Sequence, residues 1–175
     1  MILTGPEIAH QVKRGDITIA PFDQECVSPN SYDFHLSRDL CWYTDEVLDC
    51  RRENPAIRAR IPDEGVVLFP GRIYLASTAE KMGSERFVPI IRARSSIARL
   101  GLFVHVTADL IDIGSINHWT LQLHAVQPVR VYPGMRIGQV TFWVTRGEIV
   151  LYTGKYQGST LPMPSLVHRD LSGEG

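Results

Sequence analysis

Short apolar segments, many of them alternating with polar residues, recur along the chain from residue 31 onward, with turn residues between them. A period of two is typical of β-strands that bury one face. Residues 4–14 differ, because apolar side chains recur there at helical spacing between Thr4 and Gly15. The pattern predicts one short amphipathic helix, followed by strands at 17–20, 32–36, 40–43, 66–69, 73–76, 87–92, 102–107, 119–125, 129–131, 139–144 and 149–151.

The short strands and the near absence of further helical periodicity predict a mainly β fold. We expect a distorted β-barrel or a jelly-roll-like sandwich with the helix at its N-terminus. Residues 51–60 are polar and predict an excursion from the sheet. We expect a single domain over residues 1–175, in which residues 152–175 form a flexible C-terminal lid because they are rich in Gly, Ser and Pro.

Composition narrows the functional classes. The formal net charge is −1, so no overall field draws the chain to nucleic acid or to a membrane surface. The three cysteines are widely spaced and form no zinc motif of the kind found in metal-dependent nucleobase deaminases. No signal peptide and no run of eighteen apolar residues is present, and we expect a cytoplasmic protein.

Residues 94–102 carry the most concentrated candidate chemistry. The guanidinium groups of Arg94 and Arg99 flank the hydroxyls of Ser95 and Ser96, and Asp112 follows. Guanidinium groups bind phosphate oxygens with paired hydrogen bonds, and a carboxylate can activate a water molecule. On core strands, where we expect these residues, the set suits a triphosphate. Alone, it is equally compatible with an Arg-rich turn that pairs with surface acids.

Two other segments carry weaker signals. In 119–123, alternation places Thr120 and Gln122 on one face and Leu121 on the other, so the polar face lines a pocket or meets solvent. In 152–159, glycines flank Lys155, an arrangement that suits closure over phosphates or an ordinary flexible tail. His105 lies within an apolar strand and is expected to be a hydrogen-bonded core residue.

Taken together, these segments resemble the dCTP deaminase family, within the superfamily that also contains the trimeric dUTPases. The resemblance covers nearly the whole chain, through segments 1–4, 31–36, 94–102, 104–108, 111–114, 133–139 and 154–158. It implies a distorted β-barrel and a homotrimer with active sites between subunits. It also implies Mg²⁺ that is bound through the substrate's phosphates, without direct protein ligands.

The resemblance also implies site residues. It assigns catalytic roles to Ser95, Arg99, Asp112 and Gln122. Asp112 falls where the family contacts deoxyribose and, in enzymes that cleave the triphosphate, the attacking water. The implied substrate-binding residues are Arg94, Ser95, Ser96, Ile97, Ala98, Arg99, Asp112, Thr120, Leu121, Gln122, Gln139, Tyr152, Lys155 and Ser159.

One departure bears on the reaction. Deaminases of this family carry a glutamate at the position of Gln122, and an amide cannot shuttle protons between water, ring and leaving ammonia. Smaller departures are Asp109, Ser115 and Ser159, whereas Arg99 is typical of deaminases and bifunctional relatives. We therefore expect hydrolysis of dUTP to dUMP and diphosphate. The alternatives are deamination of dCTP by an altered proton relay, and a nucleotide-binding relative without turnover.

Overall fold

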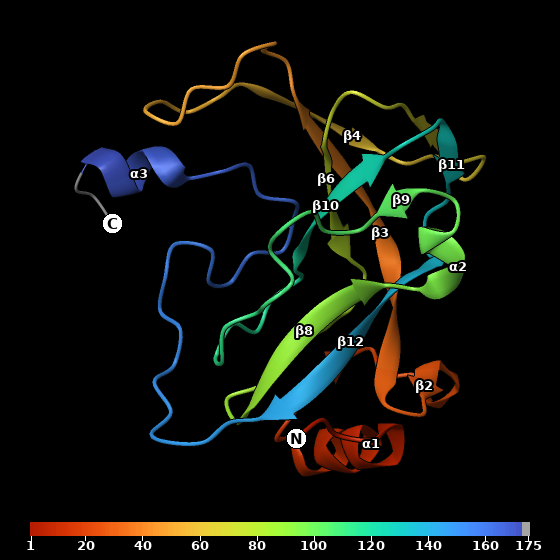
Figure 1. The fold of residues 1–175 in the computed structure, drawn as a ribbon, viewed down its shortest axis with the longest axis vertical. Helices are drawn as coiled ribbons and strands as arrows, with labels where there is room; N and C mark the ends of the chain where they lie inside the picture. Colours follow the sequence, from red (N-terminus) through yellow and green to blue (C-terminus); the bar gives the residue numbers. More distant parts are fainter. Residues whose placement is uncertain (173–175) are drawn as a thin grey trace.

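A computed structural model describes residues 1–172 of the chain (Figure 1). Its helical elements are α1 (Gly5–Arg14), the 3-10 helix η1 (Gln24–Cys26), α2 (Ser95–Ala98) and α3 (Val167–Ser172). Its strands are β1 (Thr18–Ala20), β2 (Val27–Ser28), β3 (Ser31–Tyr43), β4 (Ala56–Arg60), β5 (Val66–Leu68), β6 (Tyr74–Thr78), β7 (Lys81–Gly83), β8 (Phe87–Ala93), β9 (Leu102–Phe103), β10 (Thr120–Ala125), β11 (Val129–Val131) and β12 (Arg136–Val144). The predicted mainly β fold with a short N-terminal helix is confirmed.

The thirteen-residue strand β3 connects the two halves of a nearly closed antiparallel barrel. Its first half pairs with β12, and its second half pairs with β4 and β6 after a shift in register. The main sheet runs in the order β8-β12-β3-β6-β10-β9, and β1-β7 and β11-β5 form two small sheets. This topology carries β10 to one side of the barrel, between β6 and β9.

The core lies inside the barrel and follows the alternation along each strand. Tyr32 and Phe34 of β3 are completely buried, as are Val140 and Phe142 of β12. The two strands approach so closely that a Cβ atom on Gly138 would lie 2.1 Å from Cζ of Phe34. Only glycine leaves room for that ring, so residue 138 fixes how β12 crosses β3.

Several predicted elements differ from the structure. The strand predicted at 149–151 is absent, because these apolar residues have no partner strand among residues 1–172. The expected excursion at 51–60 contains β4, which pairs with the second half of β3. The strand predicted at 102–107 reduces to the two residues of β9. Ser95–Ala98, expected on a core strand, forms the helical turn α2.

The N-terminal helix follows its prediction more closely. It begins at Gly5, and Thr4 occupies the N-cap in an extended conformation without a side-chain capping hydrogen bond. Gly15 ends it at a φ of 81°, where its N–H donates to carbonyl oxygens of the last turn. Within residues 1–172, no helix has the length and apolar character needed to cross a membrane.

Candidate active site

A cavity of about 1120 Å³ lies beside β10 and is partly enclosed by the C-terminal segment, residues 145–172. Its walls come from β10, from the segment 106–117, from the connection between β3 and β4, and from the C-terminal segment. Figure 1 shows the C-terminal segment, in blue, running along the outside of the barrel before α3. Regions far apart in the sequence therefore meet around this cavity.

The polar wall of the cavity is one face of β10. Thr120, Gln122 and His124 are half-buried and line the cavity, whereas Leu121 and Leu123 are completely buried in the core. Successive residues of a strand point to opposite faces, so the predicted placement of Thr120 and Gln122 on one face is confirmed.

The orientation of the Gln122 amide is set by its own strand. Its Nε2 donates to the carbonyl oxygen of Thr120 at 3.2 Å. Its Oε1 therefore points away from that carbonyl, and this atom is buried without a hydrogen-bond partner among residues 1–172. A buried amide oxygen that lacks a donor loses free energy, and a ligand that supplies an N–H or O–H group recovers it.

Asp112 lies on a turn at the opposite wall, with its side chain exposed to the cavity. Gly114 follows with a φ of 90°, and a Cβ atom there would lie 3.0 Å from the backbone nitrogen of Tyr152. The close approach lets the Tyr152 N–H donate to the carbonyl of Ile113 at 2.7 Å. The turn that presents Asp112 thus also docks the start of the predicted lid.

Further hydrogen bonds hold the C-terminal segment over the cavity. The Gly158 N–H donates to Oδ1 of Asn117 at 2.5 Å, and the His118 N–H donates to the carbonyl of Ser159 at 3.1 Å. The Met163 N–H donates to Oγ1 of Thr120 at 3.0 Å. Lys155 forms an ion pair with Asp170 of α3. Tyr152, Lys155 and Ser159 all line the cavity as a result. The lid prediction extends to residue 175, and its last three residues lie outside the described part of the chain.

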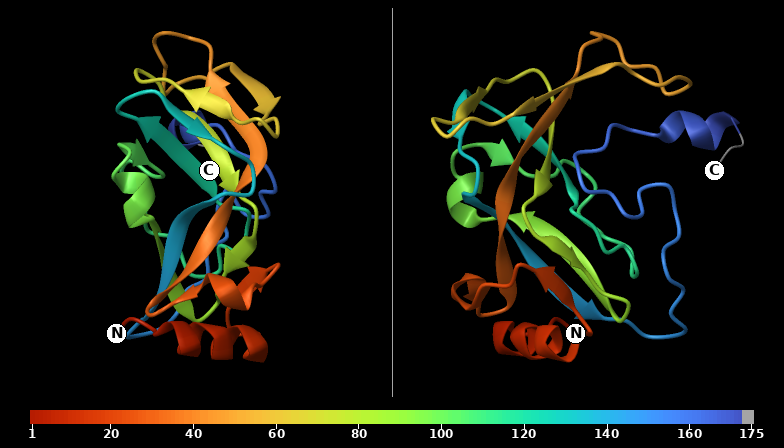
Figure 2. Two further views of the ribbon diagram at one scale, coloured as in Figure 1. Left: turned by 90° about the vertical axis from the view of Figure 1, so that its right-hand side faces the viewer. Right: turned by 180° about the vertical axis from the view of Figure 1, so that it is seen from behind.

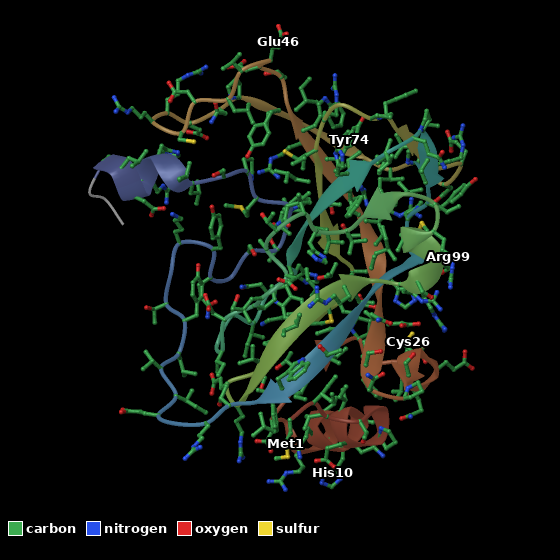
Figure 3. The ribbon with its side chains drawn as sticks, viewed as in Figure 1. Met1, His10, Cys26, Glu46, Tyr74 and Arg99 are labelled. Atoms are coloured by element: carbon green, nitrogen blue, oxygen red, sulfur yellow. The ribbon has the colours of Figure 1, made fainter. Side chains whose placement is uncertain are left out.

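The residues of α2 form a second group. Ser95, Ser96 and Arg99 are exposed on this turn, and none of them lines the cavity. In Figures 1 and 2, α2 and the C-terminal segment lie on opposite sides of the barrel. Figure 3 shows Arg99 at the outer edge of the molecule, beside α2.

Arg94 connects this second group to the core. Its Nε lies 3.0 Å from Oδ2 of Asp33, a carboxylate whose side chain is only 6% exposed. Gln139 of β12 is the register partner of Asp33 and so lies beside the same pair. The ion pair neutralises a buried carboxylate and fixes the start of α2.

The structure therefore divides the predicted site residues into two groups. Those that line the cavity are Asp112, Thr120, Gln122, Tyr152, Lys155 and Ser159. Those around α2, outside the cavity, are Arg94, Ser95, Ser96, Ile97, Ala98, Arg99 and Gln139. Leu121, like Ile97, buries its side chain in the core, so each presents only backbone groups to a ligand.

Sequence reasoning overlooked some lining residues. His124 was discoverable, because it continues the alternation of Thr120 and Gln122 by one step. Asp45 and Glu46 line the cavity from the β3–β4 connection, and no local pattern marks them. His105 differs from its prediction: it is half-buried, its Nδ1 has no hydrogen-bond partner among residues 1–172, and burial lowers its pKa.

Comparison with known proteins identifies the family and the fold. Residues 2–145 match the family model described as dCTP deaminase-like. The chain is 44% identical over 171 residues to "dCTP deaminase, dUMP-forming" of Hathewaya histolytica, covering 97% of this chain and 99% of that protein. Proteins of the same name from Clostridium beijerinckii and Leptospira biflexa are 42% and 43% identical, each over 97% of this chain and 98% of their own length.

The fold is also that of a solved structure, the 2'-deoxycytidine 5'-triphosphate deaminase from Agrobacterium tumefaciens. The TM-score is 0.65 at 20% identity, over 82% of this chain and 48% of that one, so the chain spans about half of that protein. The barrel and these relatives define an enzyme of the superfamily that contains dCTP deaminases and dUTPases. Within it, the chain belongs to the dCTP deaminase family.

Proposed function

We propose that the chain binds a 2′-deoxypyrimidine nucleoside triphosphate and converts dCTP to dUMP. The balanced reaction consumes two water molecules and releases ammonia and diphosphate. The observation that carries the proposal is that Asp112, Gln122 and Lys155 line one cavity in a chain whose relatives, 42–44% identical, are named dCTP deaminase, dUMP-forming. The relatives' names support this reaction better than they support hydrolysis of dUTP alone.

We assign roles within the cavity by chemistry. Thr120 and Gln122 face the pyrimidine edge, because the Gln122 Oε1, which has no partner among residues 1–172, can accept a hydrogen bond from the base while Nε2 stays bonded to the Thr120 carbonyl. Asp112 contacts the deoxyribose and holds the water that attacks the triphosphate. Lys155, Tyr152 and Ser159 close over the substrate from the C-terminal segment and exclude bulk water.

The phosphate-binding half of the site comes from a second copy of the chain. Arg94, Ser95, Ser96 and Arg99 are spaced for anion contacts but do not reach the cavity of their own chain. Beside α2, the apolar side chains of Leu100, Phe103 and Val126 are 49–62% exposed, which favours burial against another copy. We propose a homotrimer, as the resemblance implies, in which α2 of one subunit completes the cavity of its neighbour.

Mg²⁺ enters this proposal with the triphosphate. Among residues 1–172, no group of three or more His, Cys, Asp or Glu side chains is arranged to hold a metal ion. The ion would be held by the phosphates and water without direct protein ligands, which is a binding mode that Mg²⁺ prefers. The ion supplies charge neutralisation on the phosphates.

Gln122 favours a second candidate, hydrolysis of dUTP without deamination. Its amide neither gains nor loses a proton near neutral pH, and loss of a general acid or base typically costs about 10²–10⁴-fold in rate. Cleavage of the triphosphate needs no such group at residue 122.

Product analysis separates the two candidates. The purified chain is incubated with dCTP and Mg²⁺, and in parallel with dUTP and Mg²⁺, and ammonia and diphosphate are measured separately. Ammonia together with dUMP from dCTP supports the proposed conversion. Diphosphate from dUTP without ammonia from dCTP supports the second candidate. If neither product forms, both are refuted.

A mixing experiment tests the shared site. Arg99→Ala and Asp112→Ala are each expected to abolish turnover. When the two variants are unfolded together and refolded as mixed trimers, about one site in four receives both intact halves, so about a quarter of the activity returns. Activity that stays absent in mixed trimers contradicts a site built from two subunits.

A further inference from the structure

His124 is a titratable group on the polar wall of the cavity that no assigned role uses. It follows Gln122 by two residues on β10, so the two side chains lie on the same face. Its ring lies beside that of Phe103, with centroids 6.2 Å apart and planes tilted by 46°. Within the part of the chain that the structure describes, its ring nitrogens form no hydrogen bond or ion pair.

Most other charged groups around the cavity are already engaged or distant from Gln122. Asp45 pairs with Arg52 at 2.7 Å, and Lys155 pairs with Asp170. Glu46 is exposed on the β3–β4 connection, and Figure 3 shows it at the top edge of the molecule. Asp112 and Arg72 lie on other walls of the cavity. His124 is thus the imidazole that shares a strand face with Gln122.

The spacing between the two residues suits proton transfer through one water molecule. Residues two apart on a strand are separated by about 6.6 Å between Cα atoms. Two hydrogen bonds of about 2.8 Å each span most of that distance. A water molecule held between the two side chains would therefore contact both of them and the edge of a base.

We propose that His124 is a catalytic residue that transfers protons during deamination of a cytosine base held at Gln122. The proposal rests on the proposed conversion of dCTP. The buried Oε1 of Gln122 accepts a hydrogen bond from the exocyclic amine of cytosine, because its own Nε2 is committed to Thr120. This bond turns C4 of the ring toward the water beside His124.

The protons balance through the imidazole ring. Water adds to C4 while one ring nitrogen of His124 accepts its first proton and delivers it to N3 of the pyrimidine. The imidazole then accepts the proton of the new hydroxyl group and passes it to the amine. The C4–N4 bond breaks, ammonia leaves, and the 4-oxo group of uracil forms. His124 ends in its starting protonation state.

The test compares His124→Asn with His10→Asn, a matched control on α1 far from the cavity, and with the unchanged chain. Ammonia from dCTP and diphosphate from dUTP are measured for each protein. In His124→Asn we expect ammonia release to fall about 100-fold or more, whereas diphosphate release from dUTP changes less than about threefold. The control retains both rates. Gln122→Glu, added to His124→Asn, restores ammonia release by supplying a titratable carboxyl group on the same face.

The outcomes are distinguishable. If the unchanged chain releases ammonia and His124→Asn releases it equally fast, the role of His124 is refuted and the proposed conversion stands. If both rates fall together in His124→Asn, the residue supports packing and the role is also refuted. If the unchanged chain forms diphosphate from dUTP but no ammonia from dCTP, the proposed conversion fails, and the role of His124 with it. His124→Gln, checked by thermal unfolding, replaces His124→Asn if the latter does not fold.

Discussion

Arg94 and Arg99 lie five residues apart and are both proposed to bind phosphate, yet the structure predicts a large loss of stability for Arg94→Ala and almost no change for Arg99→Ala. Arg94 pairs with Asp33, whose side chain is 6% exposed, whereas Arg99 is exposed on α2 and has no ion pair among residues 1–172. Arg94→Ala therefore leaves an almost buried carboxylate without its counter-charge.

The magnitude follows from the cost of isolating a buried charge. Removing one partner of a buried ion pair costs about 3–5 kcal/mol. Because the Arg94 side chain is itself 35% exposed, we expect the lower end, about 3 kcal/mol. For a chain of this size, that corresponds to a fall in Tm of about 6–12 °C. Arg99→Ala should change stability by less than about 0.5 kcal/mol, as exposed substitutions usually do.

Urea unfolding of the two variants provides the measurement, and dUTP turnover is measured alongside. Both variants should lose turnover, but only Arg94→Ala should unfold at lower urea concentration. Adding Asp33→Asn to Arg94→Ala should recover most of the lost stability, because the variant then has no isolated charge. Equal unfolding midpoints for the two single variants would refute the structural role of Arg94.

Three further predictions concern other parts of the chain. Burial lowers the pKa of His105, while Asp109 raises it and Arg92 lowers it further. The stability associated with the neutral imidazole is therefore fully present above about pH 6.5 and is lost as the pH falls. His105→Asn should flatten the dependence of the urea unfolding midpoint on pH between about 7 and about 5. Gly138→Ala should cost about 1–3 kcal/mol by overpacking, measured as a lower urea midpoint, and Phe34→Leu should recover part of the loss. Deleting residues 152–175 should lower dUTP turnover about 100-fold, with a Tm change of only a few degrees; an equal loss of both would make the segment part of the core.

Local sequence patterns predicted most of the sheet because strand alternation depends only on neighbouring residues. They failed where pairing with a strand distant in the sequence determines whether a segment becomes a strand. Residues 149–151 are apolar and β-branched or aliphatic, yet Val150 is 82% exposed because no strand of the described chain reaches it. The strand β4 carries arginines among its few apolar residues, and it forms because the second half of β3 offers an unpaired edge.

The candidate site likewise contains features that local patterns predict and features that depend on the arrangement of distant strands. Alternation placed Thr120 and Gln122 on one face, and that placement is confirmed. The separation of α2 from the cavity has no local signal, because it depends on where β8 and β10 lie in the closed sheet. The four-residue turn of α2 is also too short for a helical period to be visible in the sequence.

The environment of Gln122 explains how an amide is accommodated at this position. The Thr120 carbonyl, 3.2 Å from Nε2, requires a donor at that atom. A carboxylate in the same conformation would place two acceptor oxygens in contact, so it would have to rotate or hold a proton. Glutamine at residue 122 therefore satisfies the Thr120 carbonyl in this structure, and a negative charge at residue 122 would add no stability to the folded chain. A proton-transfer group for the cavity then has to come from a position that leaves this hydrogen bond intact. His124, one step further along the same face, meets that condition.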